Sequence, residues 1–172
     1  LFGSPTHDAL YAALRELEHG AGAWAFSSGQ QVCIAPMLAF LKAGDHLLML
    51  DSIYGPTREF AEAVLSGFGV SVSFFAAADS ACIERRLRPE TRLVMLEIPG
   101  SHSMDLIDVP AITRVCRAWG VVTAIDSTWS PPLYFKPLDL GVDVVMHAST
   151  KCMAGHSDLL AGVLVANEEA WK

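Results

Sequence analysis

A lysine in the last third of the chain directly follows an apolar stretch. Lys151 comes after residues 142–149, VDVVMHAS, so we expect its amine close to buried surface. Burial disfavours the charged ammonium and makes the amine nucleophilic toward a carbonyl carbon. Lysines more often extend into solvent, so Lys151 taken alone favours a solvated side chain. Its chemistry must therefore be judged from the residues that accompany it.

A carboxylate ends another apolar stretch. Asp126 closes residues 121–126, VVTAID, which carry no other charge. A buried carboxylate is costly unless it is paired. A protonated ring nitrogen would pair with it, and the carboxylate would keep that ring positive as an electron sink. The Asp-Ser-Thr sequence that begins here also favours turns, so a turn cap is an equal alternative before the context is considered.

Three further residues have side chains or backbones that suit a cofactor. Gly29 follows two serines and begins a predicted helix, where a missing Cβ and free N–H groups favour a phosphate. Serine before a helix is also an ordinary N-cap. Thr150 adds a hydroxyl for the same phosphate, and Tyr54 can stack on a flat ring or simply pack at its turn. With Lys151 and Asp126, these residue types suit a phosphorylated aromatic cofactor that carries an aldehyde.

These residues must be positioned by the elements that precede them, and helical and apolar patterns alternate along the chain. The predicted helices cover residues 8–19, 30–45, 57–69, 80–87 and 109–120. The predicted strands cover residues 24–26, 46–50, 70–75, 92–98, 121–126, 142–149 and 159–167. Ligands of such sheets bind beyond the carboxyl ends of the strands, which is where the polar residues lie.

The strands are continuously apolar instead of polar at every second residue. This pattern is typical of a parallel sheet that is buried by helices on both sides. The last two strands are separated by a short connection, which allows one antiparallel strand. The sequence therefore predicts an α/β fold with a mostly parallel mixed sheet and helices on both faces.

The composition narrows the possible partners. Hydrophobic residues make up 52% of the chain and the formal net charge is −7. We expect no nucleic-acid partner, because no basic stripe is present to neutralise phosphates. No apolar run is long enough for a membrane span, so we expect a soluble chain without a membrane partner. The four cysteines lie far apart without a CxxC pair, which favours a reducing cytoplasm.

Histidines and an aspartate raise the alternative of a metal site. The residues concerned are His102, His147, His156 and Asp158. Only the last two lie close in the sequence, and no HxH or HExxH spacing supports a site. We therefore expect no metal.

Together these motifs resemble the trans-sulfuration (Cys/Met metabolism) family of fold-type I enzymes, which use pyridoxal 5'-phosphate (PLP). The stretch around the lysine, ASTKCMAGHSDLLAG, carries the most specific part of the resemblance. The segments SIYGPTREF, ETRLVMLEIPGS and DSTWSPPLYFKPLDLGVDVV match in the family's order. Within the family, DVPAI and GHSDLLAG are typical of the bacterial cystathionine β-lyase branch. The resemblance implies that residues 1–172 form the large PLP-binding domain.

The resemblance also implies roles for individual residues. Lys151 would form the Schiff base with PLP, Asp126 would hold the pyridine nitrogen, and Tyr54 would stack on the ring. Thr128, in the motif that begins at Asp126, would also contact the cofactor. The residues expected at the phosphate are Gly29, Gln30, Ser149 and Thr150.

Two departures from the family pattern lead to further expectations. The family serine two residues before the Thr-Lys pair is Ala148 here, and we expect the adjacent Ser149 to supply a hydroxyl in its place. Ser101 stands where related enzymes usually carry Asn. We expect Ser101 to contact the substrate and to favour β-elimination.

The reaction implied is β-elimination of L-cystathionine to homocysteine, pyruvate and ammonia. Lys151 would take the Cα proton, and Lys151 or Tyr54 would protonate the leaving sulfur. γ-Elimination or γ-replacement on the same scaffold is an alternative, and a PLP-binding fragment without catalysis is another. The resemblance implies an N-terminal arm and a C-terminal domain outside this chain, and a homodimer or homotetramer for the full-length protein.

Overall fold

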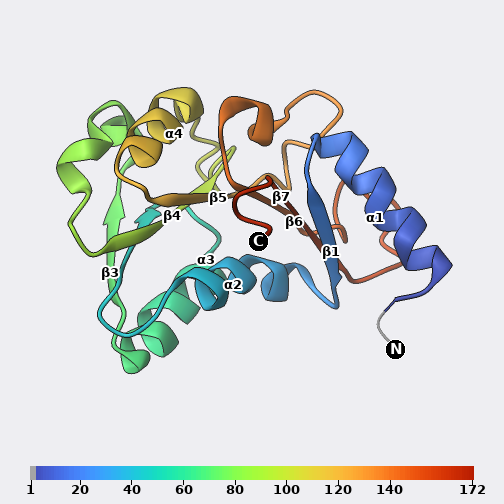
Figure 1. The fold of residues 1–172 in the computed structure, drawn as a ribbon, viewed down its shortest axis with the longest axis horizontal. Helices are drawn as coiled ribbons and strands as arrows, with labels where there is room; N and C mark the ends of the chain where they lie inside the picture. Colours follow the sequence, from blue (N-terminus) through green and yellow to red (C-terminus); the bar gives the residue numbers. More distant parts are fainter. Residues whose placement is uncertain (1–2) are drawn as a thin grey trace.

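The computed structural model describes residues 3–172. These residues form a seven-stranded sheet with helices on both faces (Figure 1). The strands are β1 (Gly22–Phe26), β2 (His46–Leu50), β3 (Ser71–Phe75), β4 (Thr91–Glu97), β5 (Val122–Asp126), β6 (Val144–His147) and β7 (Gly162–Ala166). The α-helices are α1 (Pro5–Glu18), α2 (Gly29–Phe40), α3 (Gly55–Phe60) and α4 (Val109–Ala118).

Shorter helical segments complete the layers. A π-helical turn, Ala61–Leu65, and a 3₁₀ turn, Ser66–Phe68, continue α3. Further 3₁₀ segments cover Ala77–Arg86 and Pro137–Leu140. Helix α2 ends before the predicted boundary because Leu41 takes up extended backbone and the Asp45 carboxylate accepts a bond from the Lys42 N–H.

The strand order is β1-β7-β6-β5-β4-β2-β3. β7 runs antiparallel to both of its neighbours, β1 and β6, and the other pairs in the sheet are parallel. The prediction of a mostly parallel mixed sheet is therefore confirmed. The single reversed strand is the last one, as the short connection after residues 142–149 allowed.

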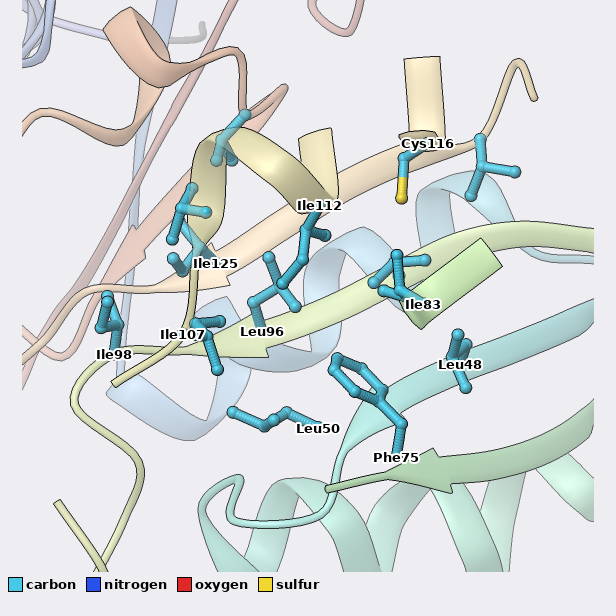
Figure 2. Close-up of a cluster of buried hydrophobic side chains, with 14 of the residues drawn as sticks. Leu48, Leu50, Phe75, Ile83, Leu96, Ile98, Ile107, Ile112, Cys116 and Ile125 are labelled. Atoms are coloured by element: carbon cyan, nitrogen blue, oxygen red, sulfur yellow. The ribbon is translucent and has the colours of Figure 1, made fainter. Parts of the chain in front are cut away.

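Successive residues of a strand face opposite helix layers, so both faces are apolar. Leu48 of β2 and Ile125 of β5 belong to the cluster that packs against α4. Figure 2 shows strand side chains of this cluster gathered beneath Ile112 and Cys116 of that helix. Leu47 of β2 packs instead with α2 and the π-helical turn on the other face. This double burial explains the continuously apolar strands.

A buried pair of side chains joins α1 to the end of β6. His147 Nε2 lies 2.5 Å from Glu18 Oε1, and both side chains are almost fully enclosed. His147 had been one of the histidines considered for a metal. The structure instead uses it to fix the last residue of β6 against α1, immediately before the segment that carries Lys151.

Between residues 3 and 172, no helix combines the length and apolar character needed to cross a membrane. In the same range, no group of three or more His, Cys, Asp or Glu side chains is arranged to hold a metal ion.

Candidate active site

A cavity of about 230 Å³ opens at the carboxyl ends of the parallel strands. Its walls come from the connections that follow β1, β2, β4, β5 and β6. The lining residues are Ser28, Gly29, Gln30, Cys33, Tyr54, Glu97, Ser101, Asp126, Thr128, Trp129, Ala148, Thr150, Lys151 and Leu160. Every site residue predicted from the sequence lies in this set except Ser149.

Asp126 forms the buried end of the cavity. It is the last residue of β5 and is only 6% exposed. Its Oδ1 accepts hydrogen bonds from the Thr128 N–H (2.9 Å) and hydroxyl (2.5 Å), and its Oδ2 accepts one from the Cys33 thiol (3.2 Å). Across residues 3–172, no Lys or Arg side chain forms a salt bridge with it. The site therefore holds a buried acceptor that lacks a cationic partner.

Thr128 orients this carboxylate. Its hydroxyl donates to Asp126 and accepts from the Ala148 N–H at 2.8 Å. The hydroxyl is thus occupied by two protein groups, which ties Asp126 to the segment that carries Lys151. Thr128 also lines the cavity, so its contact with the cofactor stays a prediction, and this geometry adds a role through Asp126.

The sequence alone assigned no role to Glu97, which lies at the buried end of the cavity. Glu97 ends β4 directly beside Asp126 in the sheet register and is 3% exposed. Its Oε2 accepts a hydrogen bond from the Tyr54 N–H and its Oε1 accepts one from the Ser101 hydroxyl, each at 2.6 Å. Burial, and then the negative charge of Asp126, raise the pKa of Glu97 to about 7.

Cys33 is a second residue that the sequence did not reveal. It lies in α2, 2% exposed, with its sulfur against Asp126. Burial first, and the neighbouring charge of Asp126 second, raise the pKa of this thiol well above its ordinary value. Cys33 therefore remains a neutral thiol that donates to the carboxylate. Only the three-dimensional contact between α2 and β5 makes this visible.

The first turn of α2 reaches the cavity at close range. A Cβ on Gly29 would lie 2.5 Å from the Cβ of Ala148, so only glycine fits here without a shift. Ser28 caps the helix by accepting from the Gln31 N–H at 3.2 Å. The N–H groups of Gly29 and Gln30 precede that bond, and helix geometry gives them no intrahelical acceptor. They can bind an anion such as a phosphate.

Gln30 and Thr150 also hold neighbouring segments in place. The Gln30 side chain donates to the Pro56 carbonyl at 3.0 Å, which links α2 to the start of α3. The Thr150 hydroxyl bonds with both backbone groups of Ala161, at 3.1 and 3.2 Å. This pair of bonds closes the connection between β6 and β7 beside the cavity.

The position of Lys151 differs from the prediction. β6 ends at His147, so Lys151 lies in the following turn and its side chain is exposed. The expectation that the Lys151 side chain is buried is therefore wrong for this chain. Residues 155–160, which follow in the same connection, are exposed as well. Its Nζ lies 5.4 Å from the centre of the Trp129 ring, at the mouth of the cavity. Tyr54 stands at the same mouth, 41% exposed.

Ser149 faces a different part of the molecule. Its hydroxyl lies 3.7 Å from the Met153 sulfur, and it lines an apolar groove of about 590 Å³ next to α1. Ala148 faces the cavity instead. The backbone alternation after β6 thus directs the two neighbours to opposite sides. The structure does not support the expectation that Ser149 replaces the missing phosphate hydroxyl.

The chemistry of the cavity fits PLP. The first turn of α2 offers N–H groups to a phosphate, and Asp126 offers a buried carboxylate to a ring nitrogen. Tyr54 and Trp129 provide aromatic faces, and the Lys151 amine stands at the mouth to meet an aldehyde. Each feature matches one functional group of this cofactor.

Comparison with known proteins gives the same assignment. The family model described as "Cys/Met metabolism PLP-dependent enzyme" matches residues 2–172. The chain belongs to this family. The Cys/Met metabolism family is PLP-dependent, so the fit of the cavity to this cofactor agrees with the family's chemistry.

Individual members of the Cys/Met metabolism family show how far the likeness extends. A "putative cystathionine beta-lyase" of Rhizobium johnstonii is 46% identical over 99% of this chain and 43% of its own length. Cystathionine beta-lyase MetC of Escherichia coli is 41% identical over 99% of this chain and 44% of its own length. The crystal structure of a cystathionine gamma-lyase from Lactobacillus plantarum, complexed with L-serine, superposes with a TM-score of 0.92. It is 35% identical over 98% of this chain and 44% of that one. This chain therefore spans less than half the length of these proteins.

Proposed function

We propose that this chain is the cofactor-binding part of a PLP-dependent carbon–sulfur lyase that converts L-cystathionine to homocysteine, pyruvate and ammonia by β-elimination. The observation that carries the proposal is the buried Asp126 carboxylate, which has no salt bridge to a Lys or Arg within residues 3–172 and shares one cavity with Lys151. A buried carboxylate in this state needs a positive group from a ligand. The names of the relatives from Rhizobium and Escherichia coli support the choice of substrate.

PLP supplies an aldehyde that captures amines and a ring that accepts electrons from the substrate Cα. Lys151 would hold the cofactor through its amine and would serve as the general base for the Cα proton. Asp126 holds the ring nitrogen in its protonated form. Gly29 and Gln30 bind the phosphate through their N–H groups. Tyr54 would stack on the ring, and Tyr54 or Lys151 would supply the proton for the leaving sulfur.

The second candidate is γ-elimination, which is favoured by the high TM-score with the cystathionine gamma-lyase of Lactobacillus plantarum. Ser101 favours the β-reaction in this proposal, because it stands where related enzymes usually carry Asn, and its hydroxyl donates to Glu97 at 2.6 Å. The test is to give L-cystathionine to the purified full-length protein and to measure pyruvate and 2-oxobutyrate. Pyruvate as the main keto acid supports the proposal, and 2-oxobutyrate as the main keto acid contradicts it. Ser101→Asn is the matched variant, expected to lower the pyruvate fraction.

We further propose that other parts of the full-length protein complete the site, and that it forms a homodimer or homotetramer. The apolar groove beside α1 exposes large side chains, including Leu133 (71%) and Tyr134 (91%). Apolar surfaces of this kind usually mark interfaces. Light scattering should find the full-length protein as an oligomer and this chain alone as associating or aggregating. A stable monomer that binds no hydrophobic dye would contradict the proposal.

We place the protein in the cytoplasm. All four cysteines are free thiols, and two of them, Cys82 and Cys152, are exposed. Exposed thiols persist most readily in a reducing compartment. Fractionation of the source cells would test this placement.

A further inference from the structure

Two carboxyl groups lie side by side at the buried end of the cavity. Glu97 and Asp126 are register partners on β4 and β5, so their side chains leave the sheet on the same face. Both are enclosed, with exposures of 3% and 6%. Two such groups cannot easily carry full negative charge together, because like charges at close range repel and burial penalises each of them.

The groups around Glu97 determine which of the two carboxyl groups changes its protonation state. Asp126 on β5 adds negative charge, and Lys151 beyond β6 adds a weaker positive influence. From α2, Cys33 stays a neutral donor to Asp126, and from the start of α3, Tyr54 donates only its backbone N–H. Asp126 accepts three hydrogen bonds from protein donors, and the pKa of Glu97 is the one that burial and this neighbouring charge raise. Glu97 is therefore the member of the pair whose proton responds to a change of charge at Asp126.

The hydrogen bonds of Glu97 give this response a structural effect. Both of its oxygens act as acceptors, one from Tyr54 and one from Ser101. A carboxylate accepts at both oxygens, whereas a protonated carboxyl uses one oxygen as a donor. Bonds to an ionised acceptor are also roughly twice as strong as neutral ones. Loss of the proton from Glu97 therefore tightens the connections that follow β2 and β4.

We propose that Glu97 is a positioning residue that couples charge at Asp126 to the placement of Tyr54 and Ser101. This inference rests on the proposed function, in which Asp126 pairs with a cationic ring nitrogen. That cation relieves the repulsion on Glu97, which releases its proton and holds the two neighbouring connections more firmly. Cofactor binding and closure of the site are thus linked through one proton.

The first test uses the full-length protein without any cofactor. Infrared difference spectra across a pH titration should show a buried carboxyl that titrates near pH 7. This signal should be absent in Glu97→Gln, and in Asp126→Asn it should remain but titrate lower by about one pH unit, because the neighbouring charge is gone. A carboxyl that titrates at the same pH in wild type and Asp126→Asn would overturn the coupling. If Glu97→Gln does not fold, Asp126→Asn still decides the question.

The second test adds pyridoxine 5'-phosphate, which keeps the ring nitrogen and phosphate but has no aldehyde to react with Lys151. Calorimetry in buffers of different ionisation enthalpy counts the protons released on binding. At pH 7 the wild-type full-length protein should release about half a proton more than its Glu97→Gln variant, since the carboxyl is then half protonated. Equal proton release by both proteins would overturn the inference. If the ligand fails to bind the wild-type full-length protein, that result counts against the proposed function, and the infrared titration decides the inference alone.

Discussion

The two ends of the sheet differ in how their buried titratable groups are paired. At the amino end, the fully buried His46 has both ring nitrogens bonded, to the hydroxyls of Thr91 (2.8 Å) and Ser73 (2.7 Å). Burial, together with the charge of Arg88, lowers the pKa of His46 to about 4, so it is neutral near pH 7. At the carboxyl end, Glu97 and Asp126 lie buried beside each other, and the pKa of Glu97 is raised to about 7.

This difference distinguishes buried polar groups that stabilise the fold from buried charged groups that are available to a ligand. His46 joins three adjacent strands, β2, β3 and β4, through neutral and fully satisfied bonds. Such bonds favour one strand register and carry no charge cost. The carboxyl end instead concentrates negative charge that the protein alone does not neutralise. Charge of this kind lowers stability unless a ligand pairs with it, which is typical of a binding site.

The largest effect should come from removing the amine at the carboxyl end. Lys151→Ala should abolish covalent attachment of PLP and turnover in the full-length protein. The unfolding free energy should change by less than about 0.5 kcal/mol, because the side chain is exposed. Borohydride reduction followed by peptide mapping checks the attachment. The control is Lys42→Ala, an exposed lysine before β2, which should leave the labelling unchanged. A label on Lys42, Lys136 or Lys172 would refute the assignment.

The second effect concerns the buried carboxylate. Asp126→Asn keeps the shape but removes the charge, so turnover of the full-length protein should fall by roughly 100-fold or more. Cofactor affinity should weaken as well, measurable by titration of the chain with PLP. The matched control is Asp143→Asn near the amino end, where the carboxylate accepts from Thr123 and Asn167. That change should cost about 1–2 kcal/mol of stability and leave PLP binding intact. A near-normal turnover rate in Asp126→Asn would show that the charge of Asp126 at the carboxyl end of the sheet is not needed for the reaction.

The third effect is a pair of opposite pH dependences of stability. The folded state binds the Glu97 proton more tightly than the unfolded state, so stability falls as the pH rises from 4.5 to about 7. For His46 the folded pKa is lowered, so stability is lost as the pH falls from 6.5 to about 4. Glu97→Gln should remove the fall in unfolding free energy that accompanies the loss of the Glu97 proton, which amounts to ~3 kcal/mol. His46→Gln should remove the acid-side loss instead.

Denaturant unfolding at intervals between pH 4 and pH 8 measures both dependences. Because the wild-type trends oppose each other, its profile should be flatter than that of either variant. Two variants with the same profile as the wild type would show that these groups are not perturbed in the folded state.

The smallest expected effect comes from packing at the first turn of α2. Gly29→Ala brings a Cβ within 2.5 Å of Ala148, so it should cost about 1–3 kcal/mol and weaken phosphate binding. Gly55→Ala is the control, because a Cβ there meets nothing within 4 Å. Thermal unfolding with and without inorganic phosphate compares the two. Equal stability and equal phosphate response in both variants would show that the close approach of α2 is unimportant.

The elements with strong local signals could be predicted from the sequence. The strand at His46–Leu50 has the predicted bounds, and the mixed sheet follows from continuously apolar strands with one short connection. The residues after these strands met in one cavity because parallel strands end at the same edge. Lys151, Asp126, Gly29 and Tyr54 were found in this way.

The remaining features depend on contacts between distant segments. The role of Glu97 follows from the pairing of β4 with β5, which places it beside Asp126. The role of Cys33 follows from the contact of α2 with Asp126, 93 residues away. The side to which Ser149 points depends on β6 ending at His147, which apolar composition does not define. The exposure of Lys151 has the same origin. Local pattern cannot supply strand order or the exact end of a strand.

The position of β7 in the sheet has a consequence for biosynthesis. Among residues 3–172, β1 pairs with the sheet through β7 alone, so the pairing of β1 must wait until β7 has been made. At ribosomal rates of roughly 5–20 residues per second, that delay is on the order of ten seconds. During this time β1 and the apolar side of α1 are available to chaperones or to neighbouring nascent chains. Slowed translation between residues 26 and 162 should therefore raise the aggregated fraction of newly made protein, even though the finished fold is unchanged.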